Sequence, residues 1–189
     1  MNELRIKDLN FAVSEAVLLA RISADEFYWS ISIDAKYPEG RIRGEVWEPK
    51  VYSENLFPLA GKALDHWRDI LGRTIEWDDC YDLKTGDPIA SVCVFEHLDI
   101  YKSKLTFGEA TGGDSFKVDW RARCDVYFDD DYGEDLELSI QTEVKFAGVE
   151  VPFQDEVKSQ ALLRQYIRGG NFTFDQAHGK YDKPIFRPV

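Results

Sequence analysis

The densest group of side chains that could bind a ligand or take part in chemistry is one acidic run, DVYFDDDYGEDLE, at positions 125–137. Seven of these thirteen residues are acids and none is basic. Carboxylates at this density can ligate a hard cation, bind the lysine and arginine side chains of a partner, or form a solvated turn. The spacing does not match a calcium-binding EF-hand loop, because counting from Asp129 the sixth residue is Glu134, not glycine, and the twelfth is Ile140, not glutamate. The sequence therefore predicts no metal site here and leaves a cationic partner or a solvated turn.

A second acidic segment, EWDDCYD at positions 76–82, also combines carboxylates with a tyrosine. Acids and tyrosine together suit lysine and arginine, through charge-assisted hydrogen bonds and cation–π contacts. One loop alone does not supply the converging oxygen atoms that a hard cation needs. We predict that the residues contacting a basic partner are Asp129, Asp130, Asp131, Tyr132, Glu134, Asp135, Asp78, Asp79 and Tyr81.

No catalytic set is evident, and we expect no catalytic residue, no metal and no cofactor. The sequence lacks HExxH, GxSxG, a P-loop and GxGxxG. The three histidines, His66, His97 and His178, are far apart in the sequence. His97 follows Glu96 at a strand end, and adjacent strand residues point to opposite faces, so the two do not form a dyad. The sequence therefore favours a protein that is not an enzyme. The alternative is an enzyme whose active site lies near His66 or His97.

Composition restricts the class of partner. The net charge of -12 is repelled by phosphates and by anionic lipids, so we expect neither a nucleic acid nor a membrane as partner. The three cysteines, Cys80, Cys93 and Cys124, fit neither a zinc pattern nor a disulfide framework, which favours the cytoplasm. A length of 189 residues supports a single domain spanning 1–189.

The elements that would position these residues follow from a dominant period of two in hydrophobicity. This period predicts strands at 27–35, 41–47 and 104–107, and the apolar run 89–95 predicts a strand buried on both faces. Helical spacing predicts one helix from Pro58 to Leu71 and a second from Asp155 to Tyr166, where Val157, Ala161, Leu162, Gln165 and Tyr166 would form the apolar stripe. Residues 171–189 are predicted to be an extended C-terminal strap.

We therefore predict an α+β fold. Its core element is one mostly antiparallel, strongly twisted sheet of about eight strands, or a half-open barrel, with the two helices on one face.

The acidic run is expected at the tip of a long hairpin whose strands are 116–128 and 136–146. Opposite charges across the strands favour the register in which Arg121 faces Glu143 and Trp120 faces Val144. The same register makes residues 129–135 the connecting loop.

These properties favour a small, acidic, cytoplasmic protein-binding module that neutralises or holds a basic protein partner. Small size, acidity, many aromatic residues and the lack of a catalytic motif are similar to the general profile of bacterial immunity proteins, which block cationic toxins. Two alternatives stay open. One is a small-ligand-binding protein or enzyme with its site on the concave face of the sheet. The other is a structural or assembly subunit that pairs its sheet edge with a neighbour.

Overall fold

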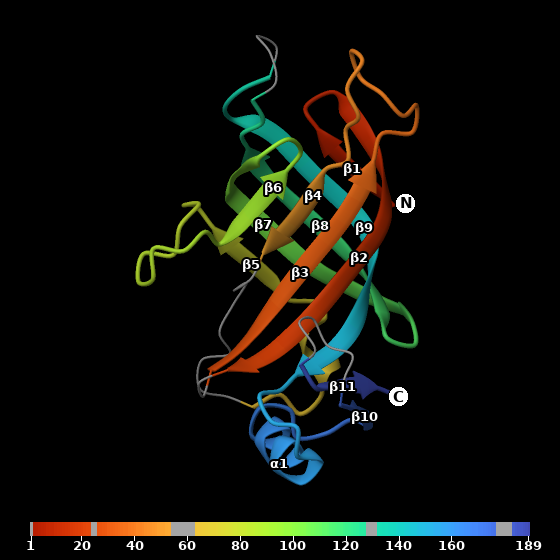
Figure 1. The fold of residues 1–189 in the computed structure, drawn as a ribbon, viewed down its shortest axis with the longest axis vertical. Coiled ribbons are helices and arrows are strands. Elements are labelled where there is room, and N and C mark those ends of the chain that lie inside the picture. The colour runs from red at the N-terminus through yellow and green to blue at the C-terminus, as the bar shows by residue number, and fades with distance from the viewer. Residues whose placement is uncertain (1, 24–25, 54–62, 128–131, 177–182) are drawn as a thin grey trace.

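In the computed structural model of the chain, eight strands surround one apolar core and close into a β-barrel (Figure 1). The structure describes residues 2–23, 26–53, 63–127, 132–176 and 183–189. In order around the wall, the barrel strands are β1 (Glu3–Ile6), β2 (Leu9–Ser23), β3 (Glu26–Lys36), β4 (Lys50–Ser53), β6 (Ala90–Cys93), β7 (His97–Gly112), β8 (Ser115–Cys124) and β9 (Leu136–Glu150).

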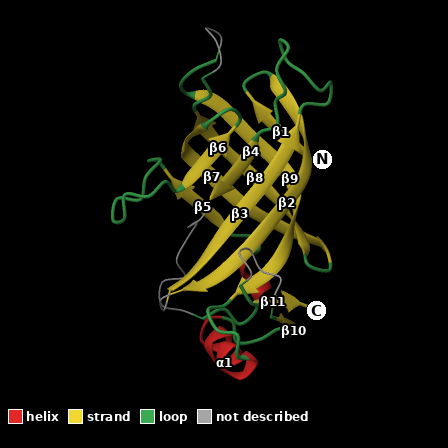
Figure 2. Cartoon of the chain, viewed as in Figure 1, coloured by secondary structure: helices red, strands yellow, loops and turns green. Residues whose placement is uncertain are grey.

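The remaining elements lie on the barrel wall or at its end. Strand β5 (Thr74–Trp77) pairs with β7, and the hairpin of β10 (Phe172–Asp175) and β11 (Ile185–Pro188) joins the end of β9. The helices are the short 3-10 helix η1 (Trp67–Ile70) and α1 (Glu156–Tyr166). Figure 2 shows that strands make up the body of the molecule and that the helices lie at one end of the barrel. The fold is therefore a β-barrel with one α-helix in its described part, and the prediction of an α+β fold with two helices is corrected.

The barrel closes because β9, the last long strand, returns to the N-terminal strands. At one end β1 lies between β2 and β9, with Leu4 opposite both Phe11 and Ile140. At the other end β2 pairs directly with β9 in parallel, with Leu18 opposite Phe146. All other neighbouring pairs in the described sheet are antiparallel. The predicted half-open barrel is thus a closed one.

Aromatic side chains fill both ends of the barrel interior. At the end that carries the helices, Trp67 of η1 stacks on Phe146 with ring centroids 4.6 Å apart, and Trp29 lies 5.5 Å from the same ring. At the other end Trp47 stacks on Phe11 at 6.2 Å. The strands alternate buried and outward-facing residues, as the period of two predicts. The concave face of the sheet is therefore a packed core, as in other small barrels.

The hairpin of β8 and β9 has the predicted side-chain phase but a different register. Trp120 is 0% exposed, as predicted, yet it faces Ile140 and not Val144. Lys117 faces Glu143, and Arg123 faces Glu137. A shift by four residues keeps the phase and pairs opposite charges equally well, so charge pairing could not select the register. Strand β8 ends at Cys124, earlier than predicted, whereas β9 begins at the predicted Leu136 and continues to Glu150, so the connection runs from 125 to 135.

The strands predicted at 27–35 and 104–107 are confirmed, and the strand predicted at 89–95 is present but shorter, as β6 with Ala90, Ser91 and Val92 buried. Two other elements differ from the predictions. Of the helix predicted from Pro58 to Leu71, the described part from residue 63 holds only the 3-10 helix η1. Segment 41–47 forms a tight turn with a single bridge between Ile42 and Glu45, because Arg43 and Gly44 have φ angles of 50° and 90°. Alternation of side chains alone does not make a strand where no partner strand lies beside it.

Helix α1 begins at the predicted position but buries a different face. Asp155 is the N-cap, and its side chain accepts a hydrogen bond from the Lys158 backbone N–H at 2.9 Å. Ser159 and Leu163 are buried, and of the predicted stripe Leu162 and Tyr166 pack against the core. Val157, which is 79% exposed, Ala161 and Gln165 face solvent, so the predicted stripe is only partly correct. None of the described helices is long and apolar enough to cross a membrane.

Gly148 lets β9 change partners. It lies at an irregularity in the pairing of β2 with β9, where its φ is +132°. A Cβ atom at this position would lie 2.2 Å from the Phe186 carbonyl oxygen of β11. Only glycine permits both this backbone conformation and this close approach.

We expect Gly148→Ala to lower the free energy of unfolding by about 3 kcal/mol or more, through backbone strain and the clash with β11. Urea denaturation followed by tryptophan fluorescence would measure this loss. The matched control is Gly133→Ala, where a new Cβ meets nothing within 4 Å. Equal stability of the two variants would contradict the proposed role of Gly148.

Candidate functional site

The structure brings the bases of the two predicted acidic segments together beside β7. The Lys102 backbone N–H donates to the Asp78 carbonyl at 3.0 Å, and Lys102 Nζ lies 3.5 Å from Asp135 Oδ1. Lys102 has a φ of 46° within an irregularity of β7, which places its side chain between the two segments. Residues far apart in the sequence thus share one acid-rich edge of the barrel.

Asp125 fixes the second acidic segment on this edge. Its Oδ1 accepts one hydrogen bond from the Tyr101 hydroxyl at 2.9 Å and another from the Asp135 backbone N–H at 3.0 Å. The Asp125 backbone N–H in turn donates to the Asp99 carbonyl at 3.2 Å. Burial, and then the hydrogen bond to Asp125, raise the pKa of Tyr101 well above its ordinary value. Tyr101 therefore stays a hydrogen-bond donor throughout the physiological range of pH.

The same acidic environment keeps neighbouring groups protonated. The negative charge of Asp99 is the largest cause of the raised pKa of Tyr81. Burial, followed by the charge of Asp99, raises the pKa of the Cys80 thiol. The Tyr127 hydroxyl donates to Glu134 Oε1 at 3.0 Å, and this bond raises its pKa. The edge therefore combines carboxylates with half-exposed neutral phenols and not with thiolate or phenolate groups.

Residues 78–88 form a loop that projects from the barrel between β5 and β6, visible in yellow-green in Figure 1. Asp82 braces the loop from within. Its Oδ1 accepts from the backbone N–H of Lys84 at 2.7 Å and of Thr85 at 3.1 Å, which lowers the pKa of Asp82. The Asp82 N–H also donates to the Asp87 carbonyl at 2.9 Å. At the tip of this braced loop, Leu83 is 90% exposed.

The predicted partner-binding residues have different positions. Asp78, Asp79, Tyr81 and Glu134 are exposed on the acidic edge. Asp135 is exposed too, but it is paired with Arg123 at 3.0 Å. Tyr132 is only 8% exposed and packs against Trp47 with ring centroids 5.3 Å apart, so it belongs to the core at the barrel end. Asp129, Asp130 and Asp131 lie outside the described residues.

Sequence reasoning missed Leu83 and Asp99. Leu83 is an isolated apolar residue in the polar turn sequence DLKTGDP, and that isolation was the available signal. The position of Asp99, close to both acidic segments, depends on the pairing of β7 with β6 and has no sequence signal.

The histidines do not form a catalytic group in the described structure. His66 caps η1, because its Nδ1 accepts from the Arg68 backbone N–H at 3.0 Å. Burial and the charge of Arg68 lower its pKa. His97 lies on the outside of the barrel in contact with Tyr52, and His178 falls outside the described residues. Among the residues that the structure describes, no three His, Cys, Asp or Glu side chains are grouped to hold a metal ion.

We expect Asp135→Asn to destabilise the protein at neutral pH and to have less effect in acid. The hydrogen bond and charge of Arg123 lower the pKa of Asp135 in the folded protein, so its stabilising contribution is present above the carboxyl's unfolded pKa of about 3.9. That contribution is lost as the pH falls through the lower folded pKa. Thermal unfolding of native protein and variant between pH 7 and about pH 2 tests this. A difference in melting temperature that stayed constant down to the lowest pH would contradict it, and Asp79→Asn is the control.

No protein-family model, no curated protein sequence and no solved structure matches this chain. The candidate site is therefore defined by its own geometry, which is an acid-rich edge beside a braced loop with an apolar tip.

Proposed function

We propose that this chain is a small protein-binding module that holds or neutralises a basic protein partner. The binding surface, here named the acidic face, consists of Asp78, Asp79, Tyr81, Leu83, Asp87, Tyr127 and Glu134. The observation that carries the proposal is the almost complete exposure of Leu83 at the tip of a loop held by its own hydrogen bonds.

Leu83 is poorly explained by folding alone. Burying a leucine side chain stabilises a protein by about 1.5–3 kcal/mol, and this one contributes almost none of that to the isolated chain. The hydrogen bonds of Asp82 hold the loop in one conformation, so little conformational entropy would be lost when a partner binds. A rigid loop that presents a bare leucine is suited to insertion into an apolar socket.

The surroundings of Leu83 select a cationic partner. Carboxylates flank the loop at Asp78, Asp79 and Asp87, and the phenols of Tyr81 and Tyr127 offer faces for lysine or arginine. The chain's net charge of -12 would steer such a partner toward it from a distance. The partner that fits is a protein with an apolar socket ringed by basic residues, as in a cationic toxin domain blocked by an immunity protein. A reducing cytoplasm suits the three cysteines, all of which are free.

The first test changes the apolar tip. Leu83→Asp should abolish retention of the partner on the immobilised protein, because burying a new carboxylate in an apolar socket is costly. Val157→Asp is the matched control, since Val157 is also strongly exposed but lies on α1. Quantitative mass spectrometry of host proteins retained by native protein and both variants is the readout. The proposal fails if Leu83→Asp retains the same basic proteins as Val157→Asp.

The second test changes the charge. The double variant Asp78→Asn with Asp79→Asn should slow association with the retained partner and flatten its dependence on salt, because exposed charges act mainly on the rate of encounter. The melting temperature should hardly change, since surface substitutions of this kind usually alter stability by less than about 0.5 kcal/mol. Stopped-flow association rates at several salt concentrations give the answer. An unchanged salt dependence would mean that these acids do not steer the partner.

A further inference from the structure

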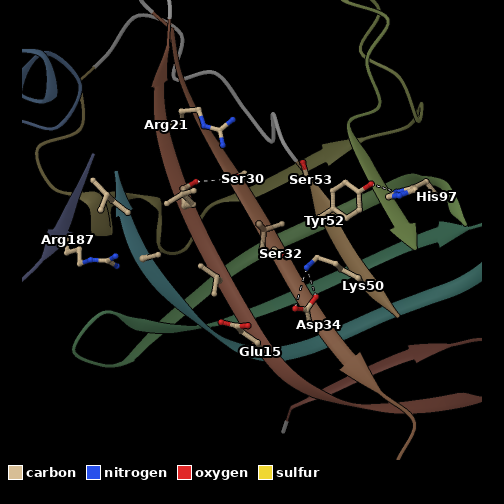
Figure 3. Close-up of a pocket in the computed structure, with 15 residues that line it drawn as sticks. Glu15, Arg21, Ser30, Ser32, Asp34, Lys50, Tyr52, Ser53, His97 and Arg187 are labelled. Atoms are coloured by element: carbon tan, nitrogen blue, oxygen red, sulfur yellow. Dashed lines mark hydrogen bonds and ion pairs between the residues drawn. The ribbon is translucent and has the colours of Figure 1, made fainter. Parts of the chain in front are cut away.

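A groove crosses the outer wall of the barrel over β2, β3 and β4 (Figure 3). Its volume is about 660 Å³, which is in the range of small-molecule sites. Figure 3 shows Arg21 toward one end, Glu15 and Asp34 toward the other, the Tyr52–His97 pair on one side and Arg187 on the other side.

The groove is hollow because two small residues lie along its middle. Ser30 and Ser32 point outward from β3, and their cross-strand neighbours on β2 are Leu19 and Val17. On the far side Ser32 is paired with Tyr52 of β4, a much larger side chain. Serine between larger neighbours on one sheet surface leaves a channel along the strand.

One side of the groove floor, although it lies on the outer surface of the barrel, is apolar. Val17, Leu19 and Ala147 of β9 are partly exposed there, and Ile185 of β11, which is itself only 2% exposed, lines the same side. Outward-facing aliphatic residues gathered beneath an open groove would gain stabilisation from an apolar ligand that covers them.

Arg21 adds a cation beside this apolar floor. Its Nε donates to Glu150 Oε2 at 3.0 Å, and Glu150 is 0% exposed. Within the part of the chain that the structure describes, Arg21 donates through Nε alone, which leaves its terminal nitrogens for a ligand. Glu150 Oε1 is buried and has no hydrogen-bond partner among the residues that the structure describes.

Burying a carboxylate with one unsatisfied oxygen costs desolvation free energy, and the attraction within a buried ion pair often does not offset that cost. The ion pair is therefore poorly explained by a contribution to stability. It does hold the guanidinium in one orientation at the groove, which is what an anchor for an anionic group needs. The cations at the remaining positions are already engaged, Lys50 with Asp34 at 3.1 Å and Arg187 with Asp175 at 3.4 Å.

We propose that the groove binds a small amphipathic anion, with its carboxylate or sulfonate on Arg21 and its apolar body over Val17, Leu19 and Ala147. The contact between the Tyr52 hydroxyl and His97 Nδ1 supplies a polar group on the opposite wall. The groove shares no lining residue with the acidic face.

The first experiment uses two dyes of similar shape. Anilinonaphthalene sulfonate carries the anionic group, and phenylnaphthylamine lacks it. On the native protein, fluorescence titration should show one saturable site for the sulfonate, with a Kd on the order of 10 μM and about tenfold weaker binding of the neutral dye. Decanoate, a carboxylate with an apolar chain, should displace the sulfonate. Binding that does not saturate, or equal affinity for both dyes, would overturn the proposal.

Two variants locate the site. Ser32→Phe should fill the channel and weaken sulfonate binding at least tenfold, whereas Ser139→Phe, at an outward-facing position of β9 outside the groove, should leave it unchanged. The double variant Arg21→Gln with Glu150→Gln removes both charges together, so that no buried carboxylate is left without its counter-ion. It should keep the neutral dye and lose the preference for the anion. Equal effects of the two phenylalanine variants would place the dye elsewhere.

Amide chemical shifts of the native protein, titrated with decanoate, test the proposal without any variant. The largest changes should fall on residues 15–21, 30–34 and 50–53. Changes spread evenly over the surface, or centred on another part of the wall, would overturn it.

Discussion

The pairing of β2 with β9 is the constraint on which the rest of the molecule depends. Without it the sheet would end in two long open edges, and the apolar faces of both strands would meet water. With it, residues such as Leu18, Trp29 and Phe146 share one sealed interior. That interior is lined by large buried side chains, and both surfaces proposed for recognition lie outside it, one on loops and one on the outer wall.

The two proposed surfaces are built by different means. The acidic face depends on backbone hydrogen bonds that hold loop 78–88 away from the barrel, with Asp82 as the brace. The groove depends on side-chain size along one strand and on a buried ion pair between β2 and β9. Because the loop and the outer wall share no described residue, a substitution on one surface should leave the chemistry of the other intact.

Local pattern predicted the strands well, and it failed where long-range pairing decides the outcome. The alternation in 27–35 and 116–124 gave the correct buried faces, because period two reports directly which side meets the core. The register of β8 on β9 was wrong, since a slip of four residues changes neither phase nor charge complementarity. Closure was not predictable either, because it depends on residues near the N-terminus meeting residues near 145.

The candidate site was likewise predictable only where it depends on local sequence and not on long-range strand pairing. Acidic runs are visible in a sequence, and the structure brings the bases of both runs to the side of β7. Tyr132 looked like a surface residue because its neighbours are charged, yet its ring packs on Trp47. The groove left no sequence signal, since Ser30, Ser32 and Arg21 gain meaning only when β2, β3 and β4 lie side by side.

The return of β9 to the first strands also governs how the chain can fold. Glu3 must find Gln141, and Val17 must find Lys145, so the contacts that seal the barrel join residues more than 120 positions apart in the sequence. Contacts this distant in sequence slow folding, because a long loop must be closed before they form. During synthesis the hairpin of β2 and β3 can form early, but its apolar face stays uncovered until residues near 150 leave the ribosome. Apolar surface that stays uncovered in this way is prone to aggregation and is the kind of surface that chaperones bind.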